Sequence, residues 1–177
     1  MWKYMKSKYF LLIVTILFLF ISCDLIKTKI SIEFDYSLFS MEKNAWKESK
    51  PQNYQYDFFR NNPGFEPEMD ALVIVENGFF KEQVPKEGEN WGGILLSVSP
   101  DYQTIDKIYD NIEYIYNINR TKNADESILL TKIIINYDSK NHVPIKTEFY
   151  YNVESGVHDV GNYMVYTIKN YKINWNV

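Results

Sequence analysis

The chain has 177 residues and a formal net charge of −4, with 46% hydrophobic and 24% charged residues. This length suits one domain with a sufficient core. The acidic balance disfavours nucleic acid as a partner, because phosphate binding needs clustered lysine and arginine. Cys23 is the single cysteine, so the chain cannot form an internal disulfide.

The first 22 residues have the order of a secretory signal peptide. Three lysines and no acidic residue occupy the first eight positions, and an apolar run of 14 residues follows at 9–22. A basic segment, a short apolar run and a final small residue are typical of such signals. A permanent helical span needs about 20 apolar residues. An uncleaved anchor that starts at Trp2, with lysines reaching the interface, is the alternative.

The apolar run ends at Ile21-Ser22-Cys23, which resembles the last three positions of the bacterial lipoprotein lipobox; Phe20 stands where leucine is usual. The resemblance implies that Cys23 receives a thioether-linked diacylglycerol, that the signal peptide is cut before it, and that the new amine is acylated. Two or more acyl chains give stable anchoring, since each buried methylene contributes about 0.8 kcal/mol. We therefore predict a lipoprotein signal peptide over residues 1–22 and lipidation of Cys23.

Cleavage before Cys23 leaves 16 basic and 23 acidic residues, a formal charge of −7. Docking onto anionic lipid needs basic clusters, so membrane contact is expected through the lipid on Cys23. This predicts a protein anchored in the cell membrane or outer membrane and facing the periplasm or the exterior. Residues 23–36 are interpreted as a lipid-attached segment or edge strand, and residues 37–177 as a single domain.

The domain is expected to begin with a strand and a helix. Residues 30–36 alternate between apolar and polar side chains, as a half-buried strand does. Residues 37–49 have helical spacing, with Ser37 as the cap and Pro51 beyond the end. The predicted apolar stripe of this helix consists of Leu38, Met41, Ala45 and Trp46.

Three strands are predicted next. Residues 53–60 place Tyr54, Tyr56 and Phe58 on one face. Residues 71–76 and 79–84 flank Asn77-Gly78, the strongest short signal for a hairpin, because both turn positions tolerate positive φ. The predicted loops are residues 61–69 and residues 85–100, the latter with a short strand at 94–98 as an option.

The second helix, over residues 104–117, has the strongest pattern. Its apolar residues recur every three or four positions: Ile105, Ile108, Tyr109, Ile112, Ile115 and Tyr116. Residues 119–127 form a polar loop. Three strands follow over residues 129–137, 143–151 and 162–174, and odd-numbered residues are expected to share a face in the first two. Strands joined by short turns indicate an α+β fold: an antiparallel sheet of about five to seven strands with two helices packed on one face.

Candidate chemistry is sparse. His142 and His158 both lie between strands and lack the spacing of metal ligands. Asp106, Asp110 and Glu113 line one side of the second helix; they suggest paired carboxylates for acid–base work or, the favoured interpretation, a solvated polar face. Nucleotide-binding, calcium-loop and nucleophile motifs are absent from the sequence. We therefore assign no catalytic, cofactor-binding or metal residue.

Tyrosine is frequent, with 15 in the chain. Several predicted strands carry aromatics on both faces, such as Tyr150 beside Tyr151 and Tyr163 near Tyr166. Aromatic residues favour strands in general. They are also enriched at interfaces, so an aromatic sheet face that binds a partner is the alternative interpretation.

Five pieces of the chain, taken in order, resemble a family of small bacterial exported and lipid-anchored domains of unknown function. They are Trp46, Tyr54-Gln-Tyr56, Val-Ile-Val-Glu-Asn-Gly at 73–78, Thr-Ile-Asp-Lys-Ile at 104–108, and Tyr137-Asp138 leading to Pro144-Ile145. The resemblance implies a fold and an exported location, and no reaction. Where the family often has Cys-x-Cys-Pro, residues 61–65 contain no cysteine, and Asn141 stands at the family's turn glycine.

These features favour a non-enzymatic, lipid-anchored binding or accessory module of the bacterial cell envelope, with a protein or small molecule as its partner. The alternative is an envelope hydrolase or transferase with an unrecognised carboxylate site, for instance one built from Asp57, Glu76 and Asp138. A purely structural envelope protein is the third class.

Overall fold

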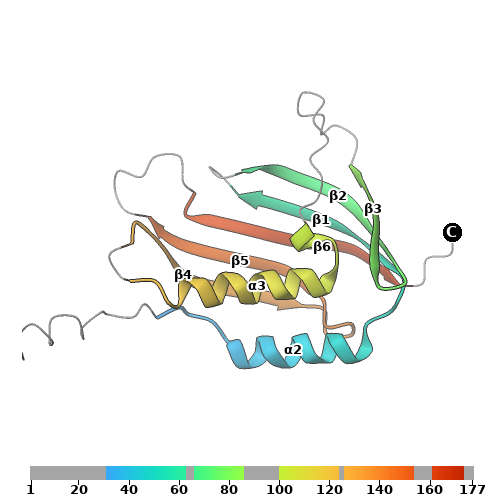
Figure 1. Cartoon of the computed structure of the whole chain (residues 1–177), viewed down its shortest axis with the longest axis horizontal. Helices are drawn as coiled ribbons and strands as arrows, with labels where there is room; N and C mark the ends of the chain where they lie inside the picture. The colour runs from blue at the N-terminus through green and yellow to red at the C-terminus, as the bar shows by residue number, and fades with distance from the viewer. Residues whose placement is uncertain (1–30, 63–65, 86–99, 124–125, 154–160, 174–177) are drawn as a thin grey trace, which may run out of the picture.

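In the part of the chain that the structure describes, six strands form one antiparallel sheet and two helices cover one of its faces (Figure 1). The computed structural model describes residues 31–62, 66–85, 100–123, 126–153 and 161–173. The predicted α+β class is confirmed. The predicted signal peptide, the candidate strand at 94–98, Cys23 and His158 all lie outside the described residues.

A helix followed by a three-stranded meander occurs twice along the chain. The elements are α2 (Tyr36–Ser49), β1 (Tyr54–Asn62), β2 (Glu66–Glu76), β3 (Phe79–Pro85), the 3₁₀ turn η1 (Pro100–Tyr102), α3 (Ile105–Asn119), β4 (Ile128–Tyr137), β5 (Pro144–Val153) and β6 (Tyr163–Ile173). The strand order is β3-β2-β1-β6-β5-β4. The two meanders therefore join through the pairing of β1 with β6, in which Phe58 lies opposite Ile168.

The segment before α2 corrects the prediction of a strand over 30–36. Among its described residues, Glu33 alone makes a bridge, parallel to Lys132 of β4. Ile32 and Phe34 are partly buried against the core, so the alternation reflects side-chain burial without a full ladder. The chain leaves the sheet because Asp35 caps the helix: its Oδ1 accepts a hydrogen bond from the Leu38 N–H at 2.9 Å. The predicted cap at Ser37 is therefore wrong.

The buried face of α2 also differs from the predicted stripe. Trp46 is buried as expected, but Leu38 and Met41 are 39% and 59% exposed. The helix instead buries Phe39, Lys43 and Trp46, at i, i+4 and i+7. The spacing of apolar residues allows either face, and contact with the sheet and α3 decides between them: Phe39 packs against the ring of Tyr109, with centroids 5.7 Å apart.

Helix α3 confirms its prediction. Thr104 caps it by accepting from the Lys107 N–H, and Ile105, Ile108, Tyr109 and Ile112 are buried. Two tyrosines of β1 form hydrogen bonds with the backbone at the start of this helix and in the η1 turn before it. The Tyr54 hydroxyl accepts from the Ile105 N–H, and the Tyr56 hydroxyl donates to the Tyr102 carbonyl at 2.7 Å. Neither described helix has the length and apolar character that crossing a membrane requires.

The β2–β3 hairpin is confirmed, with positive φ at Asn77 (53°) and Gly78 (80°). The loop predicted at 61–69 is wrong, because β1 extends to Asn62 and β2 begins at Glu66. The left-handed residue in the turn between β4 and β5 is His142 (φ 57°). The position that the family resemblance offered for this role was Asn141.

Irregular pairing changes which side chains face the core. The register of β4 against β5 shifts between Leu130 and Lys132, so Leu130 and Ile133 are both buried while Thr131 is exposed. The predicted face with Leu129 and Thr131 therefore fails at this end of the strand, since one bulge residue reverses the alternation. Periodicity alone does not reveal where a bulge falls.

We predict that Ile112→Ala lowers the free energy of unfolding by about 2–5 kcal/mol, as truncation of a buried isoleucine does. Ile108→Ala should have a similar effect, since both side chains are buried. The matched control is Ile118→Ala on the same helix, where the side chain is 41% exposed and the change should stay within about 0.5 kcal/mol. Urea unfolding measures all three. Equal losses at 112 and 118 would contradict the orientation of α3.

Candidate functional site

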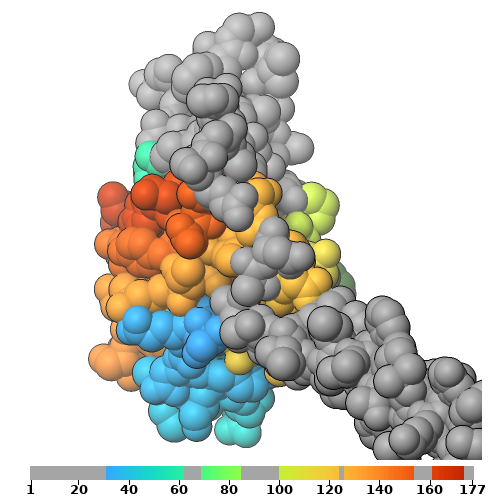
Figure 2. All heavy atoms as spheres, turned by 90° about the vertical axis from the view of Figure 1, so that its left-hand side faces the viewer, coloured from blue at the N-terminus to red at the C-terminus, as the bar shows by residue number. Residues whose placement is uncertain are grey.

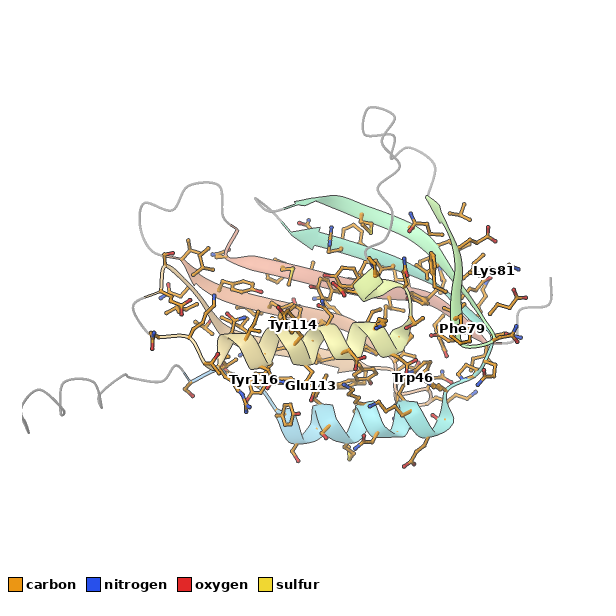
Figure 3. The ribbon with its side chains drawn as sticks, viewed as in Figure 1. Trp46, Phe79, Lys81, Glu113, Tyr114 and Tyr116 are labelled. Carbon is orange, nitrogen blue, oxygen red and sulfur yellow. The ribbon has the colours of Figure 1, made fainter. Side chains whose placement is uncertain are left out.

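The three carboxylates on α3 face α2 and pair with Lys43 of that helix and with Lys50 at its C-cap. Lys43 Nζ lies 2.8 Å from Asp110 Oδ1 and 2.7 Å from Glu113 Oε2. Lys50 Nζ lies 2.7 Å from Asp106 Oδ1. Figure 3 shows Glu113 in the space between the two helices. The predicted polar face of α3 is therefore an ionic seam that holds the helices together.

The electrostatics of this seam favour the ionised form of Glu113. Hydrogen bonds from Lys43, and then from the Tyr36 hydroxyl, lower the pKa of Glu113. Burial opposes the charge on Lys43, but its bonds to Asp110 and Glu113 outweigh burial and raise its pKa. A general acid needs a raised carboxyl pKa at neutral pH. The geometry therefore suits Glu113 to structural pairing.

His142 forms hydrogen bonds with residues of both helices. Its Nδ1 lies 2.8 Å from Glu42 Oε2 on α2, and its carbonyl accepts a hydrogen bond from the Tyr109 hydroxyl on α3. In the described part of the chain, no group of three or more His, Cys, Asp or Glu side chains is placed to hold a metal ion. The contacts of His142 explain its position in the turn as a link between sheet and helices.

The three carboxylates of the alternative enzyme hypothesis lie on separate elements. Asp57 accepts from Asn170 Nδ2 at 2.6 Å, and Glu76 pairs with Lys81 at 3.0 Å beside the β2–β3 hairpin. Asp138 accepts the N–H of Asn141 at 2.7 Å in the β4–β5 turn. Strands β6 and β5 separate β1, which carries Asp57, from β4, which ends just before Asp138. The structure does not bring them together.

Most strand tyrosines belong to the core, on the helix-covered face. The opposite face carries a small polar cluster, in which the rings of Tyr150 and Tyr163 are 5.2 Å apart. Glu148 accepts from the Tyr163 hydroxyl at 2.8 Å and pairs with Lys146 at 2.9 Å. The Lys146 bond is the main cause that lowers the pKa of Glu148. The predicted aromatics on both faces are thus present, with the helix-free face holding the smaller share.

A groove of about 520 Å³ lies between the segment that enters α2 and strand β4. We call it the edge groove; its lining residues are Glu33, Phe34, Asp35, Leu38, Lys132, Ile133, Ile134, Ile135 and Tyr137. Figure 2 shows the blue start of the described chain against the orange strands. Sequence reasoning missed this site, because its two walls are about 100 positions apart. The alternation over 30–36 was the one available signal.

Comparison with protein-family models, with curated proteins and with solved structures finds no match to this chain.

We predict that Glu113→Gln destabilises the protein at neutral pH and that this loss shrinks on acidification. The folded-state pKa of Glu113 lies below its ordinary value of 4.5. Its stabilisation is therefore present above that value and disappears as pH falls through the folded-state pKa. Urea unfolding at neutral pH and at about pH 3 measures the difference. The exposed Glu48→Gln on α2 is the control, and an equal Glu113→Gln loss at both pH values would exclude the ionised pair as its cause.

We also predict that residues 30–177, produced without the signal peptide and Cys23, fold on their own without metal or disulfide. Thermal unfolding should have the same midpoint within about 1 °C with and without EDTA, and with and without dithiothreitol, because 1 kcal/mol shifts a domain of this size by about 2–4 °C. A fall of several degrees in EDTA would reveal a metal site and would favour a metal-dependent function built on the loop carboxylates.

Proposed function

We propose that this protein is a lipid-anchored cell-envelope protein whose α+β domain binds a partner and performs no chemistry. The observation that carries the anchor is Cys23, the single cysteine, directly after a basic segment and a 14-residue apolar run. A thiol at this place is suited to acylation, and two or more acyl chains anchor a protein stably. The mature charge of −7 leaves the lipid as the means of membrane contact.

The binding role is supported by the contrast between the paired charges on α3 and the open apolar walls of the edge groove. The α3 carboxylates already pair with lysines of α2, and the lowered pKa of Glu113 does not suit a proton donor. The edge groove, in contrast, combines apolar walls with charged residues in a volume typical of ligand sites. Recognition through this groove is the function that the geometry supports best.

Metabolic labelling with palmitate tests the anchor. The wild-type protein should incorporate the fatty acid and sediment with membranes. Cys23→Ala should incorporate none, because the thioether cannot form, and the uncleaved form should be longer by the signal peptide. Cys23→Ser is the matched control for side-chain size. Equal labelling of wild type and Cys23→Ala would rule out the lipoprotein interpretation.

A further inference from the structure

We infer that the edge groove binds an extended, basic and apolar peptide segment of a partner protein, which adds a strand to the open edge of β4. The inference rests on the proposed binding role and specifies its partner.

Strand β4 ends the sheet, and the described residues bond across its outer edge at Glu33. The Glu33 N–H donates to the Thr131 carbonyl at 2.9 Å, and the Ile133 N–H donates to the Glu33 carbonyl at 3.0 Å. A parallel strand that continued this pattern would next bond Ile133 C=O and Ile135 N–H through residue 35. Asp35 instead caps α2. Within the described part of the chain, the β4 backbone from the Ile133 carbonyl onward therefore makes no bond across this edge.

The composition of β4 makes this edge unusual. Its ten residues, ILLTKIIINY, include one charged side chain, Lys132. The opposite edge strand, β3, places Lys81 and Glu82 in exposed positions within seven residues. Charged side chains on edge strands discourage pairing with other chains, and long apolar edges invite it. Of the two sheet edges, β4 is thus the one suited to strand addition.

The groove offers apolar contacts to alternate side chains of such a strand. Phe34 and Leu38 form one wall, and Ile135 and Tyr137 form the other. Leu38 is 39% exposed although it lies on the helix that packs on the core. Its position in the groove lining accounts for that exposure. Side chains of an added strand point alternately to the two sheet faces, so every second residue of the peptide would meet this apolar lining.

The charge around the groove is acidic. Lys132 is already paired with Glu33 at 2.7 Å, which leaves the carboxylate of Asp35 as the net charge of the lining. Glu42, which is bonded to His142, lies one helical turn after Leu38 on α2. A lysine or arginine between the apolar residues of the partner segment would complement this charge.

Binding of a synthetic peptide tests the inference on the full-length protein in detergent. The probe is the peptide Thr-Val-Lys-Val-Lys-Val-Thr, amidated at its C-terminus and labelled with fluorescein at its N-terminus, and its binding is followed by fluorescence anisotropy. Two control peptides separate the contributions: one carries glutamate in place of lysine, and one is N-methylated on alternate residues to remove strand hydrogen bonds. Saturable binding of the probe, with binding of each control weaker by about tenfold or more, is expected.

Protein variants locate the site. Leu38→Arg places a bulky cation in the groove and should weaken probe binding by about tenfold. Met41→Arg, 59% exposed on the same helix outside the lining, should leave it unchanged. The inference is overturned if the probe does not bind, if either control peptide binds equally well, or if both variants behave alike. Probe binding that appears only after deletion of residues 24–30 would assign the groove to the chain itself and also overturn it.

The same titration with Cys23→Ala keeps this inference separable from the proposed anchor. The described lining of the groove comes from residues 33–38 and 132–137, so the affinity of Cys23→Ala for the probe should be unchanged. Loss of palmitate labelling without loss of probe binding leaves the groove assignment standing. Normal labelling of the wild type without probe binding overturns the groove assignment and leaves the anchor standing.

Discussion

The antiparallel pairing of β1 with β6 is the constraint on which the rest of the structure depends. It joins two meanders that each have only three strands and one helix, and it sets Phe58 opposite Ile168 across the join. A sheet of six strands has an apolar face wide enough to receive both helices (Figure 1). Separated, each half would expose the side chains that now form one continuous core.

Buried tyrosines make this core specific as well as apolar. The Tyr56 hydroxyl donates to the Tyr102 carbonyl, and the hydroxyls of Tyr102 and Tyr166 are 2.9 Å apart. Burial raises the pKa of Tyr56 and Tyr166 well above the ordinary value. Both therefore stay neutral and serve as hydrogen-bond groups that fix η1 and α3 over β1 and β6. An unpaired buried hydroxyl would destabilise any other arrangement.

The N-cap of α2, Asp35, is the feature of the fold on which the proposed binding groove depends. Asp35 stops the N-terminal segment from pairing further along β4, and it caps α2 two residues before Ser37, the cap that the sequence suggested. With α2 beginning at this cap, Phe39 and Lys43 are buried and Leu38 lies in the edge groove. The ionic seam of Lys43 with Asp110 and Glu113 then holds α2 in place. The groove is thus a consequence of how the first helix begins.

Local patterns were sufficient to predict α3, the Asn77-Gly78 hairpin and the α+β class, because helix periodicity, turn chemistry and strand alternation act over a few residues. They also carry the prediction at Cys23. The buried face of α2, the bulge at Thr131 and the role of Lys43 needed contacts between segments far apart in the chain. The edge groove needed the same, since its lining joins residues 33–38 to residues 132–137. Interactions within a few residues determine where helices, strands and turns form. Packing between segments far apart in the chain determines which faces of those helices and strands are buried and which are exposed.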